Sequence, residues 1–179
     1  MKKYPEYKGS GIEWLGVIPE HWQVKRLKFL VHNIVEKTEL NGFHIALENI
    51  ESGTGNYIVP DNSSELSGDM KSFKIGDILF NKLRPYLAKV YLAKQEGNCV
   101  GELLVLRPKQ NILSKFIFYR LLSRDFIEIV NGSTYGAKMP RASWEDFIRN
   151  LLIPYPNLNE QTAIANFLDH KTQQIDDLI

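Results

Sequence analysis

The 179-residue chain contains a single cysteine, Cys99, and lacks long hydrophobic runs. One cysteine cannot form an internal disulfide framework or a cysteine-based zinc site, and such scarcity is typical of a reducing compartment. No apolar stretch approaches the length of about 18 residues that indicates a membrane-spanning helix, and residues 1–8 are too polar for a secretory signal peptide. We therefore expect a cytoplasmic protein without a membrane partner.

Patterns typical of catalysis are also scarce. The four histidines lack the spacing of metal ligands, and no Gly-x-Ser-x-Gly nucleophile turn is present. Ile153-Pro-Tyr-Pro156 is not the Asn/Asp-Pro-Pro-Tyr/Phe pocket of an adenine methyltransferase. The pair Gly53-x-Gly55 lacks the third glycine of a dinucleotide site and is interpreted as a turn. We expect no catalytic residue and no metal site.

One nuclease-like pattern is kept as an alternative. Pro60-Asp61 followed by Asp69-Met-Lys71 matches the Pro-Asp and Asp-x-Lys signature of metal-dependent nucleases, in which carboxylates hold a divalent ion and lysine assists the attacking water. That chemistry requires the second acid and the lysine on a core strand. Here both are expected to lie in a polar loop, Pro60 to Lys71, so a nuclease using Asp61, Asp69 and Lys71 is the less favoured interpretation.

The charge distribution is informative only locally. With 44% hydrophobic and 24% charged residues the composition is that of a folded domain, and the net charge is only +1. Between Lys71 and Lys94, however, six basic residues stand against one acid, a local balance of 6 − 1 = +5. Such a segment fits a phosphate-facing surface, although solvated strand faces have the same composition.

The order of elements predicts an α+β fold: a mixed, largely antiparallel sheet domain with flanking helices, followed by a protruding C-terminal helix of coiled-coil type. Strands are expected first and helices later. The expected strands cover residues 44–50, 73–80, 88–93, 100–106 and 151–153, the fourth being central because it is dense in Leu and Val. Helices are expected at 114–122, 125–131 and 144–149, with Ser114 and Ser143 as N-caps and Gly132 closing the second.

We expect the rest of the chain to be organised around its C-terminal stretch. Pro154 and Pro156 are expected to end the globular part, and Asn159 to cap a helix that has Glu160 in its first turn. Four apolar residues of this helix fall on coiled-coil spacing, with Lys171 in a polar core slot. These predicted helix-interface residues are Ile164, Leu168, Ile175 and Leu178. The alternative is an ordinary amphipathic helix that closes its own core.

Two loops could contact nucleic acid. Asn81 to Tyr86 lies between two expected strands, and Ser133 to Arg141 carries two positive charges and no acid. Arginine can bind guanine bidentately, lysine can meet phosphate, and tyrosine can stack. The predicted DNA-binding residues are Lys82, Arg84, Tyr86, Thr134, Tyr135, Lys138 and Arg141. The alternative for Arg84 and Tyr86 is a surface salt bridge and an aromatic at the edge of the core.

Four stretches, in this order, resemble the specificity subunit of type I restriction-modification systems. They are Tyr7-Lys-Gly-Ser-Gly-Ile-Glu-Trp-Leu-Gly-Val-Ile-Pro-Glu-His-Trp22, Gly76-Asp-Ile-Leu-Phe-Asn-Lys-Leu-Arg-Pro-Tyr86, Glu102-Leu-Leu-Val-Leu-Arg-Pro108, and Pro156 to Leu168. The first and last are the most specific. Together they cover nearly the whole chain.

The resemblance implies a non-catalytic DNA-specificity function. Residues 1–153 would form a target recognition domain, including an N-terminal docking arm, 1–22, whose Trp14 and Trp22 brace the base of the C-terminal helix. Residues 154–179 would be a proline hinge and the beginning of the family's spacer helix. A full specificity subunit has two such domains, so the chain would be a first half or a half-subunit that dimerises.

Partners follow from the same resemblance. The chain would read one half of a bipartite target in double-stranded DNA. It would position that target for modification subunits, which methylate adenine using S-adenosylmethionine, and for a restriction subunit that uses ATP and magnesium. The chain itself would bind no cofactor. The alternative from another class is a protein interaction module that acts through its C-terminal helix.

Overall fold

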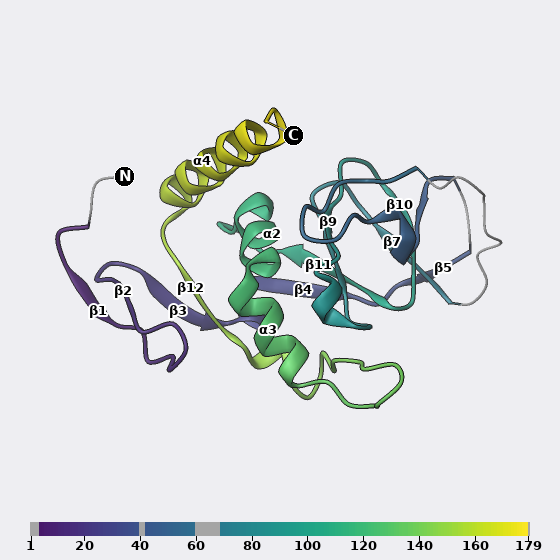
Figure 1. Cartoon of the computed structure of the whole chain (residues 1–179), viewed down its shortest axis with the longest axis horizontal. Helices are drawn as coiled ribbons and strands as arrows, with labels where there is room; N and C mark the ends of the chain where they lie inside the picture. The colour runs from purple at the N-terminus through teal and green to yellow at the C-terminus, as the bar shows by residue number, and fades with distance from the viewer. Residues whose placement is uncertain (1–3, 40–41, 60–68, 179) are drawn as a thin grey trace.

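The computed structural model describes residues 4–39, 42–59 and 69–178 (Figure 1). The strands are β1 (Tyr7–Gly9), β2 (Val17–Pro19), β3 (Gln23–Arg26), β4 (Val31–Ile34), β5 (Lys37–Thr38), β6 (His44–Ile45), β7 (Met70–Phe73), β8 (Ile78–Asn81), β9 (Val90–Leu92), β10 (Gly97–Val100), β11 (Leu103–Pro108) and β12 (Leu152–Tyr155). The α-helices are α1 (Leu27–Leu30), α2 (Ser114–Leu122), α3 (Arg124–Gly132) and α4 (Leu158–Asp176), and the 3-10 helices are η1 (Leu47–Asn49), η2 (Pro85–Leu87) and η3 (Ile148–Asn150).

A four-stranded antiparallel sheet in the order β4-β11-β8-β9 forms the centre of the domain. Side chains of β11 alternate between its two faces. Leu104 and Leu106 enter a core shared with α2 and α3, whereas Leu103 and Val105 enter a second core on the opposite face. The expected central strand is confirmed, although residues 97–100 form the separate strand β10.

The second core is closed by a smaller sheet in the order β5-β7-β10-β6, in which only the β10–β6 pair is parallel. Two antiparallel pairs, β1-β2 and β12-β3, complete the described strands. Figure 1 places β5, β7 and β10 to one side of α2 and α3, with β1 and β2 on the other. The expected mixed, largely antiparallel α+β fold is therefore confirmed.

The region around the prolines differs from the prediction. Pro154 does not end the last strand but pairs with Val24 inside β12, which continues to Tyr155. Proline is tolerated there because a two-stranded ribbon consists of edge strands. The helix α4 is capped by Asn157 rather than Asn159, since the Asn157 side chain accepts a hydrogen bond from the Glu160 backbone N–H at 3.0 Å. Glu160 does lie in the first turn, as predicted.

Two predicted N-caps behave differently from each other. The helix at 114–122 is confirmed with its bounds, but Ser114 is its first residue, and Leu113 stands at the N-cap position without a side-chain bond. Ser143 does accept a bond from the Asp146 backbone N–H at 3.1 Å. The segment after it is nevertheless not an α-helix, because only η3 forms there.

The C-terminal helix α4 is anchored to the domain as far as Asp169. Ile164 packs against the main core, and the Lys115 ammonium and the Tyr119 hydroxyl contact the Asp169 carboxylate at 2.6 and 2.7 Å. Residues 170–178 are all exposed. The helix therefore both completes its own domain and presents an exposed C-terminal end (Figure 1).

We predict that Gly55→Ala destabilises the domain by roughly 2–4 kcal/mol in urea unfolding. Gly55 has φ +73°, and an added Cβ would lie 2.3 Å from the Val90 carbonyl oxygen and 2.8 Å from the Phe118 ring. The control is Gly9→Ala, because a Cβ there meets no atom within 4 Å. Equal stability of the two variants would contradict this packing.

Candidate nucleic-acid interface

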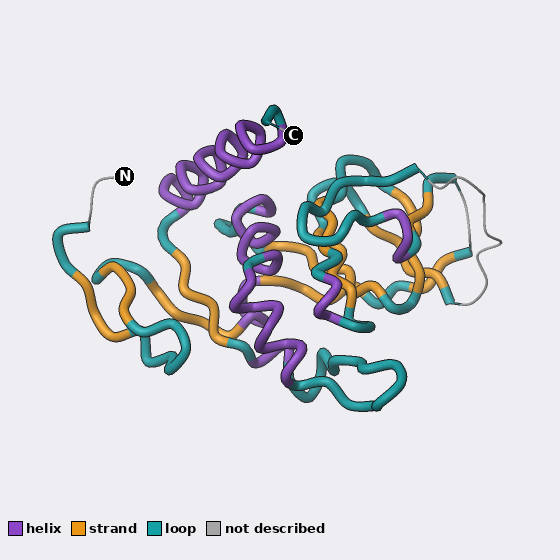
Figure 2. The backbone as a smooth tube through the Cα atoms, viewed as in Figure 1, coloured by secondary structure: helices purple, strands orange, loops and turns teal. Residues whose placement is uncertain are grey.

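The two loops predicted to contact nucleic acid meet in the structure. We call residues 82–88, after β8, and residues 133–142, after α3, the paired loops; the second is the long loop at the lower right of Figure 2. Arg84 donates its backbone N–H to the Pro140 carbonyl at 2.7 Å, and Ala142 donates to the Lys82 carbonyl at 2.9 Å. Two segments that are more than fifty residues apart in sequence, around residues 82 and 141, are thus joined in one surface.

Asn81 fixes the first of the paired loops. Its side chain is 2% exposed, donates to the Leu83 carbonyl at 2.6 Å and accepts from the Leu83 N–H at 2.9 Å. After this turn Arg84 takes a left-handed conformation with φ +52°, and Ala88 does the same with φ +48°. Such conformations cost non-glycine residues about 1–2 kcal/mol each, so the surrounding bonds must hold the loop in place.

The predicted residues have different surroundings. Arg84, Tyr86, Tyr135 and Lys138 are exposed, whereas Lys82 and Arg141 are partly buried. The Thr134 hydroxyl bonds within its own turn: it donates to the Asn131 carbonyl at 2.8 Å at the end of α3.

Arg141 has a partner that the sequence did not reveal. Its guanidinium donates from Nε and Nη2 to the two carboxylate oxygens of Glu102, at 3.1 and 2.5 Å. Glu102 lies in the turn before β11, and its carbonyl accepts the Lys82 N–H at 3.2 Å. Glu102 was visible in the sequence as the one acid of the otherwise apolar expected strand 100–106, but no sequence pattern linked it to Arg141.

The remaining lysines of the basic segment are dispersed. Lys71 donates to the Leu103 carbonyl, and burial lowers the pKa of its ammonium. Lys89 donates to the Leu47 carbonyl at 2.6 Å, while Lys94 lines a groove beside α4. The positive surface is thus narrower than the local charge count indicates.

The nuclease alternative gains no support from the geometry. Asp61 lies outside the described residues, and Asp69 is exposed and pairs with Lys37 at 2.7 Å. Across residues 4–39, 42–59 and 69–178, no group of three or more His, Cys, Asp or Glu side chains could hold a metal ion.

A second feature surrounds the base of α4. The Glu160 carboxylate accepts hydrogen bonds from the Tyr4 hydroxyl, from the Trp22 indole at 3.0 Å, and contacts His21 Nε2 at 2.7 Å. Trp22 therefore braces the helix base, as predicted. Trp14 does not, because its ring lies 5.2 Å from the guanidinium carbon of Arg120.

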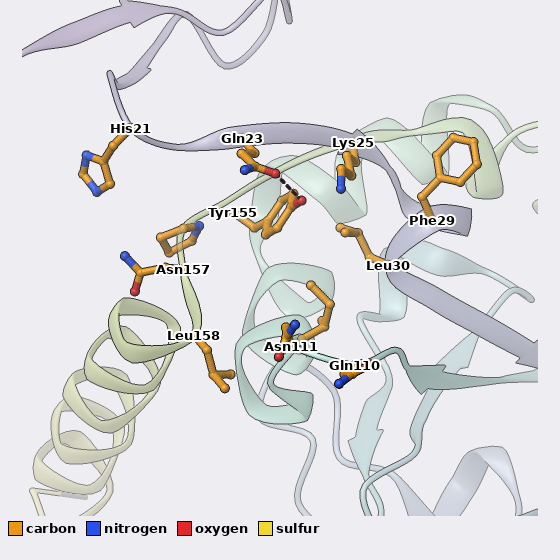
Figure 3. Close-up of a pocket in the computed structure, with 12 residues that line it drawn as sticks. His21, Gln23, Lys25, Phe29, Leu30, Gln110, Asn111, Tyr155, Asn157 and Leu158 are labelled. Atoms are coloured by element: carbon orange, nitrogen blue, oxygen red, sulfur yellow. Dashed lines mark hydrogen bonds between the residues drawn. The ribbon is translucent and has the colours of Figure 1, made fainter.

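A groove lies between the β3–β12 ribbon and the start of α4 (Figure 3). The Tyr155 hydroxyl donates to Gln23 across the ribbon at 2.7 Å, and Asn157 and Leu158 lie where the helix begins. The ribbon and the helix thus meet at residues 155–158. This joint sets the direction in which α4 leaves the domain.

Gln161 locks this joint from inside. It is 1% exposed; its oxygen accepts from the Leu113 N–H at 2.8 Å, and its nitrogen donates to the Asn111 and Pro156 carbonyls at 3.2 and 2.9 Å. No pattern in the sequence indicated that this polar residue would be fully buried.

The predicted helix-interface residues divide into two pairs. Ile164 and Leu168 are partly buried, and Ile164 packs on the domain. Ile175 and Leu178 are 57% and 86% exposed, as is Phe167 at 40%. Intramolecular packing thus occupies part of the stripe, and its distal part is open.

We predict that Gln161→Ala lowers the free energy of unfolding by about 2–3 kcal/mol, because it leaves one buried N–H and two carbonyls without partners. Amide exchange in α4 should accelerate more than exchange in β11. Thr162→Ala on the exposed face is the control and should change stability by at most about 0.5 kcal/mol. Similar losses in both variants would show that Gln161 does not anchor the helix.

The Glu160 cluster predicts a pH dependence. Burial opposes ionisation, but the hydrogen bonds from Tyr4, His21 and Trp22 outweigh it and lower the pKa of the Glu160 carboxyl. A lowered folded-state pKa gives stability above the unfolded value, about 4.3, that is lost as the pH falls through the folded value. Urea unfolding between pH 6 and 3 should show this loss, and Glu160→Gln should reduce it. An unchanged pH profile would contradict the assignment.

Within the described part of the chain, no helix combines the length and apolarity needed to span a bilayer.

Comparisons with known proteins agree with this fold. The specificity subunit of the Escherichia coli type I restriction enzyme EcoDI is 28% identical over 158 residues, which is 83% of this chain and 34% of that protein. The crystal structure of the HsdS subunit from Thermoanaerobacter tengcongensis has a TM-score of 0.74 at 22% identity, covering 90% of this chain and 44% of that chain. The type I restriction-modification S subunit from M. genitalium gives 0.59 at 19% identity, covering 88% and 40%.

The chain therefore spans about a third of its curated relative and less than half of these solved chains. A family model described as "Type I restriction modification DNA specificity domain" matches residues 19–178. This match covers most of the sequence and confirms the resemblance seen in its motifs. The chain belongs to the family of type I restriction-modification DNA specificity domains, a non-catalytic, DNA-recognising family.

Proposed function

We propose that the chain reads one half of a bipartite target in double-stranded DNA through the paired loops. The observation that carries the proposal is the joining of two basic loops from distant parts of a DNA-specificity domain. Lys82, Arg84 and Lys138 supply cations there, Arg141 adds a guanidinium paired with Glu102, and Tyr86 and Tyr135 supply exposed rings, 54% and 61% accessible. Cations meet phosphates, while arginine and tyrosine can also contact bases.

The proposed partners act on the DNA that this chain positions. Modification subunits would methylate adenine with S-adenosylmethionine, and a restriction subunit would use ATP and magnesium, whereas this chain would bind no cofactor. The second recognition domain would be supplied by another segment or by a second half-subunit. The exposed Phe167 and Ile175 on α4, and Leu178 just after it, support a helical partner for the spacer.

The same exposed residues favour a second candidate function, a protein interaction module that acts through α4. In that case the basic loops would only solubilise the domain. DNA binding that falls steeply with salt supports the first function, because phosphate contacts release counterions. Binding to a protein partner alone, unaffected by salt, supports the second.

We predict that Arg84→Ala and Lys138→Ala weaken DNA binding by the complex with the modification subunit without unfolding the domain. Each change should reduce the slope of log affinity against log salt by about 1 if one phosphate contact is lost. Lys25→Ala, which removes an exposed cation from β3, is the matched control. Unchanged affinity for both loop variants would remove the paired loops from the DNA surface.

A further inference from the structure

We propose that Arg141 reads a guanine and that Glu102 is the positioning residue that aims it. The inference rests on the proposed function and deepens it, because it separates base reading from phosphate binding within the paired loops. The observation behind it is the bidentate pair between the Arg141 guanidinium and the Glu102 carboxylate.

Arg141 is fixed at its backbone as well as at its side chain. Its N–H donates to the Tyr135 carbonyl at 3.0 Å, and its carbonyl accepts the Tyr135 N–H at 3.2 Å. Its other side forms an antiparallel bridge with Leu83. Arg141 therefore lies in the second of the paired loops, at the point where that loop is joined to the first.

The Glu102 pair leaves the outer end of the guanidinium free. Arginine has five N–H donors, and Nε and Nη2 each give one to Glu102, so 5 − 2 = 3 remain on Nη1 and Nη2. These donors form the end-on fork that matches the O6 and N7 acceptors of guanine in the major groove. The side chain is 40% exposed, and no hydrogen bond joins Nη1 to another described residue.

The Glu102 carboxylate makes a phosphate an unfavourable ligand for Arg141. A carboxylate beside the guanidinium cancels its charge and repels a phosphate, but it raises no such barrier to the uncharged edge of a base. Arg84 and Lys138 contrast with Arg141: no hydrogen bond or ion pair joins either side chain to another described residue. Free, unoriented cations suit phosphates, and an oriented fork suits a base.

The Glu102 position follows from the central sheet. Leu103 pairs with Asn81, so the residue before β11 lies beside the residue after β8. Glu102 and Lys82 are joined there by the backbone bond at 3.2 Å. A rigid strand end, rather than a mobile loop, holds the carboxylate that aims Arg141.

The test selects bound sequences from a random DNA library with the complex of this chain and the modification subunit. We compare the wild type with Glu102→Gln, Arg141→Lys and Lys138→Ala. The wild type should select a G·C pair at one position. Glu102→Gln and Arg141→Lys should reduce the preference for guanine there, by roughly 5- to 150-fold if the bidentate contact is lost, and leave other positions unchanged.

The affinity for random DNA distinguishes the orienting role of Glu102 from the electrostatic contribution of a cation such as Lys138. Glu102→Gln removes a negative charge and should not weaken binding to random DNA, whereas Lys138→Ala should weaken binding to all sequences equally and keep the selected motif. Thermal unfolding checks that each variant is folded. If only Glu102→Gln is destabilised, the guanine preference of Arg141→Lys decides whether the assignment holds.

Two results overturn the assignment while leaving the proposed function intact. One is a wild-type motif without a G·C pair. The other is a motif that neither Glu102→Gln nor Arg141→Lys alters, or that both weaken uniformly. A wild-type complex that selects no sequence at all contradicts the proposed function itself, and with it this assignment.

Discussion

The structure depends on a single antiparallel sheet that is buried on both faces. Alternate residues of β11 fill two different cores, and β8 repeats the pattern, with Ile78 and Phe80 on one side and Leu79 on the other. Full burial of each such side chain contributes about 1.5–3 kcal/mol, and a register slip of one residue would exchange the two sets. The register of the central strands is therefore strongly fixed, and so are the positions of their ends.

The proposed DNA-contacting loops take their positions from the ends of these strands. Because β8 and β11 run antiparallel, the loop that leaves β8 and the turn that enters β11 lie at the same end of the sheet. The second of the paired loops reaches this end of the sheet from α3, and backbone hydrogen bonds join it to the first. Towards the C-terminus, buried Gln161 and the Glu160 cluster attach α4 to the same domain, so the paired loops and α4 belong to one folded unit.

The sequence predicted what depends on local pattern and missed what depends on pairing across the chain. Strand density and helix periodicity located α2 and the central strand, and local turn chemistry located the paired loops. Asn159 was predicted as the cap because it directly precedes Glu160, whereas the structure places Asn157 at the cap position. The link between Glu102 and Arg141 could not be read, since 39 residues separate them and the antiparallel register brings them together.

The central claim is that the paired loops are the surface that meets DNA. Hydrogen–deuterium exchange of the complex with the modification subunit, with and without DNA, tests this most directly. The account predicts slower exchange at residues 82–88 and 133–142 when DNA is present, with little change in α4 beyond that caused by the partner. Unchanged exchange at both loops, with protection confined to another face of the domain, would contradict it.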